Sequence, residues 1–280
     1  MKTIKRIRTL QETLRGLRPG RRIALVPTMG AFHEGHLSLM RKAKQSGDFV
    51  VVSLFVNPLQ FGPEEDLKVY PRDLRSDRNK AKKCGVDLLW TPAPEEILPS
   101  PYRTFINVEK LSKRWEGEAR PGHFKGVATI VAKLLQLIAP DDLYLGQKDF
   151  QQVRVIQQLV RDLHFKTSVH RLPTVREADG LAMSSRNSRL SSADRKAAPV
   201  LYQTLQAARK MIRQGERESQ EVLEASETKI RMEPRARINY LALCDPETLE
   251  PLKWLERRSV FLAAIQIGTV RLIDNVFVNI

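Results

Sequence analysis

The sequence of 280 residues predicts an α/β protein in which a doubly wound, parallel-sheet (Rossmann-like) N-terminal domain precedes a smaller α+β C-terminal domain. Three observations support this fold class. Short apolar runs alternate with helical stretches between residues 22 and 175, one of these runs is apolar on both faces, and the alternation stops after Val175. We therefore expect two domains, residues 1–176 and residues 177–280.

The spacing of apolar residues predicts the elements of the N-terminal domain in order. Ile4, Ile7, Leu10, Leu14 and Leu17 recur at helical spacing, so residues 4–17 should form an amphipathic helix. Residues 49–56 are typical of a strand in the middle of a parallel sheet, because neither face is polar. Altogether we expect strands over residues 23–27, 49–56, 86–90, 104–108, 142–145 and 166–175, and helices over residues 4–17, 36–45, 74–84, 127–138 and 149–163.

The C-terminal domain has a different pattern. Long polar helical stretches run across residues 193–232, and short strand candidates follow at residues 238–243, 259–267 and 269–273. Strands grouped after helices are typical of an α+β domain.

The charge of the chain suggests, but does not require, a polyanionic partner. Lysine and arginine number 47 against 32 acidic residues, which gives a formal net charge of +15. Eight of the basic residues lie in residues 1–22, where they fit the solvated face of the first predicted helix. Aromatic residues are few and do not alternate with basic ones, which disfavours a nucleic-acid partner.

Composition also bears on the compartment. The two cysteines, Cys84 and Cys244, give no disulfide framework and no four-cysteine zinc site, as expected in a reducing compartment. The longest uncharged stretch, residues 49–63, is shorter than the roughly 20 apolar residues of a membrane span. No apolar segment follows the basic N-terminus, so we expect a cytoplasmic protein without a secretory signal or a membrane partner.

Polar residues and glycines gather where the predicted strands end, and ligands of open α/β sheets bind at the carboxyl ends of the strands. The most informative segment has His33 and His36 on either side of Gly35, just where a helix should begin. Both imidazoles could therefore contact a phosphate over a helix N-terminus. Helix capping is an alternative role for the two histidines, whereas zinc binding is disfavoured because no third ligand is near.

Two further segments are candidates for phosphate binding. Lys148 follows a glycine turn and precedes a predicted helix, and residues 183–187 offer two hydroxyls and a guanidinium. Taken singly, each is also compatible with an ordinary surface loop. The chain contains neither a GxxxxGK loop nor a GxGxxG fingerprint, so a nucleotide would have to be held in another way.

Taken together, the motifs resemble those of the nucleotidyl-transferase superfamily that shares its adenylating site with class I aminoacyl-tRNA synthetases. Within that superfamily the chain resembles the pantothenate synthetases over its whole length. The segments that carry the resemblance are Pro27-Thr28-Met29-Gly30-Ala31-Phe32-His33-Glu34-Gly35-His36-Leu37, Phe55-Val56-Asn57-Pro58-Leu59-Gln60-Phe61, Tyr70-Pro71-Arg72, Arg120-Pro121-Gly122-His123-Phe124, Gly146-Gln147-Lys148-Asp149-Phe150-Gln151-Gln152 and Arg271-Leu272-Ile273-Asp274-Asn275.

The resemblance implies an ATP-dependent ligation of pantoate and β-alanine through a pantoyl adenylate, with Mg²⁺, in a homodimer whose C-terminal domain acts as a lid. The implied catalytic residues are His36, the family's proton donor, with His33, Lys148, Ser184, Ser185 and Arg186. Implied contacts with ATP are Met29, Gly30, Ala31, Phe32, His33, Glu34, Gly35, His36, Gly146, Gln147, Lys148, Asp149, Val175, Met183, Ser184, Ser185 and Arg186. Implied contacts with pantoate are Gln60, Gln152, Asn57 and Phe61. The metal ligands are not implied.

The sequence departs from the family pattern at Phe32, where leucine is common, and at Gln147, where glutamate is usual. Two other functions are also compatible with the sequence. A nucleotidyl transferase acting on a phosphorylated acceptor would also carry the histidine motif, but it would call for arginine or lysine in place of the amides of Gln60 and Gln152. A basic RNA-binding module would show affinity that falls steeply with salt.

Overall fold

The computed structural model describes residues 1–17, 20–62, 67 and 70–280. The chain forms two compact units. The first contains Met1–Lys113, Arg120–Gln147 and Gln152–Pro173, and the second contains Arg114–Ala119, Lys148–Gln151 and Thr174–Ile280. Two short segments that precede residue 176 in the sequence therefore belong to the second unit.

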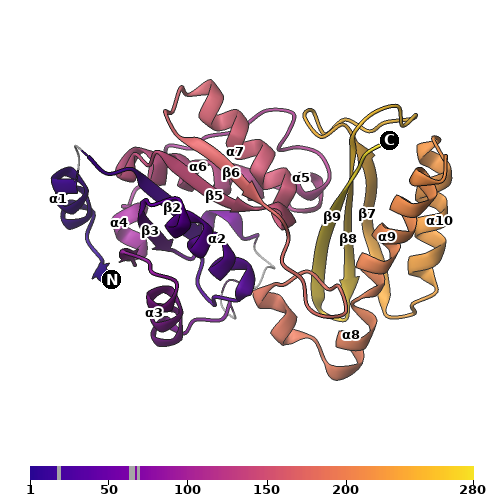
Figure 1. The fold of residues 1–280 in the computed structure, drawn as a ribbon, viewed down its shortest axis with the longest axis horizontal. Coiled ribbons are helices and arrows are strands. Elements are labelled where there is room, and N and C mark those ends of the chain that lie inside the picture. Colours follow the sequence, from indigo (N-terminus) through magenta and orange to yellow (C-terminus); the bar gives the residue numbers. More distant parts are fainter. Residues whose placement is uncertain (18–19, 63–66, 68–69) are drawn as a thin grey trace. The chain divides into compact units, whose positions relative to one another are not determined.

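The first unit is built on a sheet of six parallel strands (Figure 1), in the order β1-β4-β3-β2-β5-β6. The strands are β1 (Lys2–Ile4), β2 (Ile23–Thr28), β3 (Phe49–Leu54), β4 (Leu88–Trp90), β5 (Asp142–Gly146) and β6 (Ser168–Leu172). The central strand β2 pairs with β3 along its whole length and with β5 at its start. Because the chain winds outward from β2 in both directions, the sheet is doubly wound.

Helices cover both faces of this sheet. They are α1 (Ile7–Leu17), α2 (Glu34–Gln45), α3 (Leu74–Lys83), α4 (Pro94–Ile97), α6 (His123–Ile138) and α7 (Phe150–Asp162). In Figure 1, α2 and α3 lie on one side of the sheet, and α6 and α7 lie on the other. Ala24 and Val26 of β2 pack toward α2 and α3, while Ile23 and Leu25 are equally buried on the opposite face. The absence of a polar face on β2 and β3 is thus explained by helices on both sides.

Most of the predicted elements of this unit are confirmed, but two regions differ. Residues 104–108, predicted as a strand, form no regular structure; the amide of Ile106 instead donates to Thr129 Oγ1 of α6, at 2.9 Å. The first predicted helix begins at Ile7 rather than Ile4, because Lys2–Ile4 pairs with β4 as the edge strand β1. In both regions the observed structure depends on a contact with residues distant in the sequence: Thr129 for Ile106, and strand β4 for strand β1.

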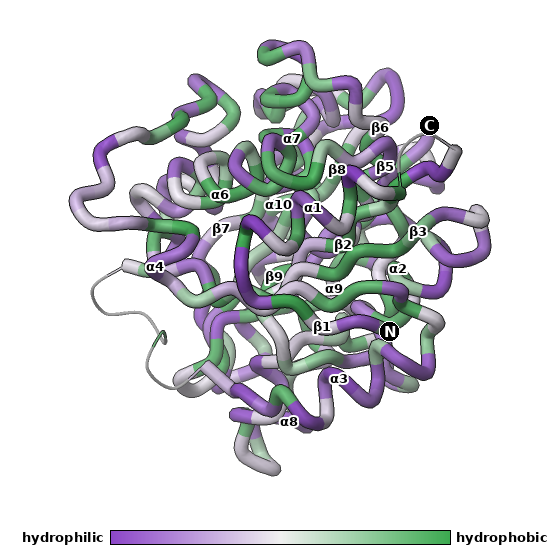
Figure 2. Tube along the Cα trace, turned by 90° about the vertical axis from the view of Figure 1, so that its left-hand side faces the viewer, coloured by the Kyte–Doolittle hydropathy of each residue, from purple (hydrophilic) through white to green (hydrophobic). Residues whose placement is uncertain are grey.

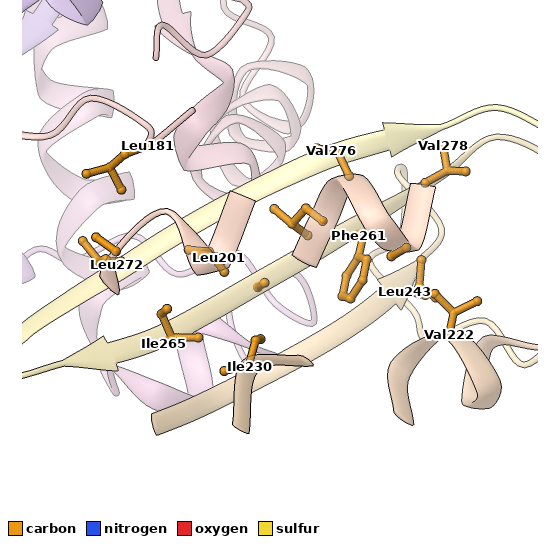
Figure 3. Close-up of a cluster of buried hydrophobic side chains, with 14 of the residues drawn as sticks. Leu181, Leu201, Val222, Ile230, Leu243, Phe261, Ile265, Leu272, Val276 and Val278 are labelled. Carbon is orange, nitrogen blue, oxygen red and sulfur yellow. The ribbon is translucent and has the colours of Figure 1, made fainter. Parts of the chain in front are cut away.

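The second unit consists of a three-stranded antiparallel sheet and helices. Its strands are β7 (Ala236–Cys244), β8 (Ser259–Ile267) and β9 (Val270–Val278), and its helices include α5 (Glu116–Ala119), α8 (Ser192–Ala197), α9 (Val200–Arg213) and α10 (Ser219–Arg231). Figure 3 shows Leu201, Val222 and Ile230 of the helices in one buried hydrophobic cluster with Phe261 and Ile265 of β8. Together, the doubly wound unit and this smaller α+β unit confirm the predicted fold class.

The two segments that join the second unit from earlier in the chain are fastened to its sheet. The carboxylate of Glu116 in α5 pairs with Arg271 and accepts a hydrogen bond from the hydroxyl of Tyr240 at 3.3 Å. The ring of Phe150 packs edge-on against Phe277 with centroids 5.2 Å apart. These contacts complete the buried surface of β9 and its neighbours.

The hydropathy of the chain follows its burial (Figure 2): β2 and β3 are largely green, whereas α3 is largely purple. Among the residues that the structure describes, no helix combines the length and the apolar character needed to cross a bilayer.

Candidate active site

The two histidines of the His33-Glu34-Gly35-His36 segment cap helix α2. His33 is the N-cap residue, with extended backbone angles, and its Nδ1 accepts the amide of Gly35 at 3.2 Å. In return, Nδ1 of His36 accepts the amide of His33 at 3.3 Å. The result is a reciprocal capping box in which both side chains are imidazoles. The predicted start of a helix at this segment is confirmed.

The capping hydrogen bonds determine which ring nitrogens carry protons. Because Nδ1 of each histidine accepts a backbone N–H, each neutral ring has its proton on Nε2. The ring centroids lie 4.1 Å apart, so the two imidazoles form one cluster at the helix N-terminus. Such a cluster suits an anion, since the helix dipole and both donors favour negative charge. Capping and anion binding are therefore compatible roles.

The backbone before the cap turns sharply. Gly30 and Ala31 both have positive φ angles, 91° and 53°. Phe32 is buried among α2, α3 and the sheet, and its ring centroid lies 5.6 Å from that of His36. Glu34 instead is exposed and forms an ion pair with Arg41 on the outside of α2. The segment thus directs His33 and His36, rather than Glu34, toward the same cluster.

A second group of side chains follows strand β3 and centres on Gln60. Asn57 caps the short helix η1 (Pro58–Gln60) by accepting the amide of Leu59, and its Nδ2 donates to Gln60 Oε1 and to the carbonyl of Gly126, both at 3.1 Å. With both amide hydrogens committed, Asn57 orients Gln60. The Nε2 of Gln60 lies 3.2 Å from Met29 Sδ, which joins this group to the end of β2.

The main chain of Gln60 is held as firmly as its side chain. Its carbonyl accepts from His123 Nδ1 at 2.9 Å and from Arg120 Nη2 at 3.2 Å, while Arg120 Nη1 lies 3.2 Å from His123 Nε2. The ring of Phe61 packs edge-on against Tyr70. An amide fixed in this way offers both donor and acceptor groups to a ligand bearing hydroxyls.

The two neighbouring glutamines that follow β5 differ in environment. Gln151 is buried and structural: it donates to the carbonyl of Arg114 at 2.7 Å and accepts the amide of Glu116 at 3.1 Å. Gln152 is partly exposed in the first turn of α7. At Gly146 a Cβ would meet no atom within 4 Å, so space is open beside this backbone.

In the second unit, a pocket brings together two of the predicted site residues, Lys148 and Ser184. Its lining includes Lys148, Ser184, Asn187, Arg271 and Asp274. The Asn275 side chain holds the carbonyl of Lys148 at 3.0 Å, and Ser184 Oγ accepts the amide of Arg186 at 3.3 Å at the start of η3 (Ser185–Arg189). Asn187 lies in the candidate segment 183–187 and Arg271 in a segment that carries the family resemblance, but the sequence assigns a role to neither.

A buried ion pair supports this pocket. Arg176 binds Asp274 through both guanidinium ends, at 2.5 and 2.9 Å, and its guanidinium lies 4.0 Å from the ring centroid of Tyr202. Burial raises the pKa of Asp274, whereas its hydrogen bond with Arg176, the charge of Arg176 and that of Lys148 act in the opposite direction. Val175 lies next to this pair, and its carbonyl accepts the amide of Met183 at 3.0 Å. The ion pair thus anchors the Arg176 end of the loop that precedes Ser184, and the main-chain hydrogen bond of Met183 ties the other end to Val175.

Gln147, Lys148 and Asp149 form the short helix η2 (Gln147–Asp149), in which Lys148 Nζ lies 3.9 Å from a carboxylate oxygen of Asp149. Within residues 1–17, 20–62, 67 and 70–280, no group of three or more His, Cys, Asp or Glu side chains is arranged to hold a metal ion. The predicted site residues offer hydrogen-bond donors that suit anions, and side-chain amides that suit hydroxyl groups.

Comparisons with known proteins all point to one family. A model of the family described as pantoate-beta-alanine ligase matches residues 1–277. A pantothenate synthetase of Syntrophotalea carbinolica is 47% identical over 279 residues, which cover 99% of each chain. One of Moorella thermoacetica is 49% identical over 261 residues, which cover 93% of this chain and 92% of the relative.

Solved structures are similar over nearly the whole chain as well. The crystal structure of a pantothenate synthetase from Thermus thermophilus superposes with a TM-score of 0.94 at 47% identity, covering 99% of both chains. A pantoate-beta-alanine ligase from Francisella tularensis, complexed with beta-gamma ATP and β-alanine, gives a TM-score of 0.81 at 36% identity, covering 99% of this chain and 97% of that one. The chain belongs to the pantoate-β-alanine ligase family of enzymes.

Proposed function

We propose that this enzyme joins pantoate and β-alanine through a pantoyl adenylate. A carboxylate oxygen of pantoate attacks the α-phosphorus of ATP, and pyrophosphate leaves. The amine of β-alanine then attacks the activated carbonyl carbon, and AMP leaves as pantothenate forms. Both nucleophiles are supplied by the substrates, so the protein has to position them and to stabilise charge.

The double histidine cap is the observation that carries this proposal. Two Nε2–H groups at one helix N-terminus are donors that already lie in place before the phosphates gain charge, the arrangement that lowers the barrier of phosphoryl transfer. We assign His36 as the proton donor, with His33 beside it. Lys148, Ser184, Ser185 and Arg186 would neutralise the phosphates from the second unit.

Adenosine and its phosphates would lie along the other predicted segments. In this proposal they contact Met29, Gly30, Ala31, Phe32, Gly35, Gly146, Gln147, Asp149, Val175 and Met183. Gln60 and Gln152 would hold the hydroxyls of pantoate, with Asn57 and Phe61 shaping its pocket. Magnesium would enter with ATP as the metal complex of the substrate, coordinated by phosphate oxygens.

The adenylate can be tested directly by isotope exchange. Purified protein with ATP, magnesium and pantoate, but without β-alanine, should move label from pyrophosphate into ATP, and exchange should stop when pantoate is omitted. AMP and pantothenate should accumulate only after β-alanine is added. Pantothenate formation without any pantoate-dependent exchange would contradict the adenylate, and transfer of the nucleotide onto the acceptor as the final product would indicate a nucleotidyl transferase.

Substitutions test the assigned residues. His36→Ala and Lys148→Ala should each lower turnover by roughly a hundredfold or more, the scale of removing one preorganised donor. His164→Asn is a matched control, because His164 is exposed at the end of α7, outside the proposed site. Activity of both alanine variants within about threefold of the parent would remove these residues from the mechanism.

We further infer that the protein acts in the cytoplasm as a homodimer. Both cysteines are free and buried, which suits a reducing compartment. The dimer rests on the family resemblance, and light scattering of the purified chain would test it.

A further inference from the structure

Two side chains of helix α3 form hydrogen bonds with the turn that precedes the histidine cap. Asp77 Oδ2 accepts the amide of Ala31 at 2.8 Å, and Oδ1 accepts the amide of Phe32 at 2.7 Å. One turn further along α3, Lys80 Nζ donates to the carbonyl of Phe32 at 2.7 Å. We call Asp77 and Lys80 the α3 clamp. The clamp satisfies three main-chain groups of a turn that forms no regular helix or strand: the amides of Ala31 and Phe32 and the carbonyl of Phe32.

The clamp combines a buried carboxyl group with a strained main chain, two unfavourable features that packing alone does not require. The Asp77 side chain is almost completely buried, at 1% exposure, and burial raises the pKa of its carboxyl against the opposing effect of the two amides and Lys80. Ala31 adopts φ 53°, a left-handed conformation that is strained for a non-glycine residue. A strained turn held by a buried carboxylate persists only when the surroundings fix it.

The clamp connects to the histidines through Phe32. Both main-chain groups of Phe32 belong to the clamp, and its ring contacts the ring of His36. The next residue, His33, is the N-cap of α2 and carries the second imidazole. A displacement of the turn would therefore move both rings.

We propose that Asp77 and Lys80 are positioning residues that hold the Ala31–Phe32 turn so that the imidazoles of His33 and His36 meet the phosphates of ATP. This inference rests on the proposed function of the two histidines. It concerns residues that lie more than 40 positions away in the sequence, on a helix that itself carries no group assigned to substrate.

A pair of aspartates on α3 provides a matched test. Asp77→Asn keeps the shape of the side chain but turns one acceptor into a donor that faces a main-chain amide. Asp73→Asn changes the exposed N-cap of the same helix, which accepts the amide of Ser76 at 2.9 Å and is not part of the clamp. Each variant is measured for its unfolding midpoint in urea, for kcat and KM in the exchange assay, and for the nitrogen chemical shifts of its histidine rings by NMR.

We expect Asp77→Asn to lower kcat by ten- to a hundredfold, the scale of a misplacement of about 1 Å, with a KM for pantoate close to that of the parent. We also expect the Nδ1 and Nε2 shifts of His33 and His36 to move in this variant. Asp73→Asn should lose stability through its cap and retain both kcat and the shifts. Should Asp77→Asn fail to fold, Lys80→Met removes one arm of the clamp and should show the same pattern with a smaller loss.

Two results would overturn the proposal. One is turnover per folded molecule of Asp77→Asn within about threefold of Asp73→Asn, and the other is a loss of turnover with unchanged histidine shifts. If the parent protein shows no pantoate-dependent exchange, the proposed function fails instead; the NMR shifts then still decide whether the clamp sets the position of the rings.

Discussion

Replacing Gly35 by alanine places a methyl group where the structure has the ring of His33. A Cβ at this position would lie 2.8 Å from Cε1 and 2.9 Å from Nδ1 of that imidazole. Apart from its chain neighbours and the backbone of its own helix, no other atom is within 4 Å, so the ring itself has to move. The substitution therefore perturbs one proposed donor without adding bulk anywhere else.

The expected change in stability is small, because two effects oppose each other. Loss of the His33 cap costs about 0.5–2 kcal/mol, while alanine is favoured over glycine within a helix by about 1 kcal/mol. The free energy of unfolding should therefore stay within about 1 kcal/mol of the parent. Turnover should fall by roughly a hundredfold or more, since one preorganised donor leaves the phosphates.

The assay compares kcat/KM for ATP with urea unfolding in the same preparations. Gly16→Ala is the matched control: Gly16 is exposed in α1, a Cβ there meets nothing within 4 Å, and we expect equal activity with slightly higher stability. The double variant His33→Ala Gly35→Ala should be no less active than His33→Ala alone, because the methyl group then has no ring to displace. Activity of Gly35→Ala within about threefold of the parent, or a further loss in the double variant, would refute this reasoning.

Three other perturbations have outcomes that the structure specifies. Gly126→Ala would bring a Cβ to 2.2 Å from the carbonyl oxygen of Leu59, a main-chain atom, and should lower the free energy of unfolding in urea by about 1–3 kcal/mol. Burial and the nearby Asp142 raise the pKa of Asp48, so its carboxyl favours the folded state below the ordinary value of 3.8 and loses this contribution as the pH rises through the folded pKa. Asp48→Asn should therefore unfold at a higher temperature than the parent at neutral pH and at an equal temperature below 3.8; a variant less stable at neutral pH would contradict this. Burial raises the pKa of the Cys244 thiol to about 12, so mass spectrometry should find it modified by a thiol reagent at about pH 8 in urea but not in the native protein.

The sequence predicts the central strands well because their physical requirement is local. Residues 23–27 and 49–56 lack a polar face, and only a strand covered on both sides explains that pattern. Strand β1 has three residues, and its apolar Ile4 also fits the helical spacing of α1, so its assignment depends on pairing with β4. Residues 104–108 show the opposite case, in which strand-like alternation finds no neighbouring strand.

In the candidate site too, the features that depend on neighbouring residues can be predicted, whereas those that depend on distant contacts cannot. Glycine beside histidine at the start of a helix predicts a cluster at the end of β2, and the structure shows both imidazoles there. Which ring nitrogen carries the proton depends on the distances in the cap, and spacing alone does not determine it. The role of Lys80 depends on a contact over 48 positions, and the presence of Asn187 in the pocket lining depends on the fold of the second unit.

The second unit is assembled from three separate stretches of chain, and this limits how its gene can be cut and recombined. A product starting at Thr174 would lack the glutamate that neutralises Arg271 and the phenylalanine that packs on Phe277. Chimeras between relatives that exchange only the C-terminal portion would pair β9 with Arg114–Ala119 and Lys148–Gln151 of a foreign parent. We therefore expect that chimeras fold well only when these two segments are exchanged together with the C-terminal portion.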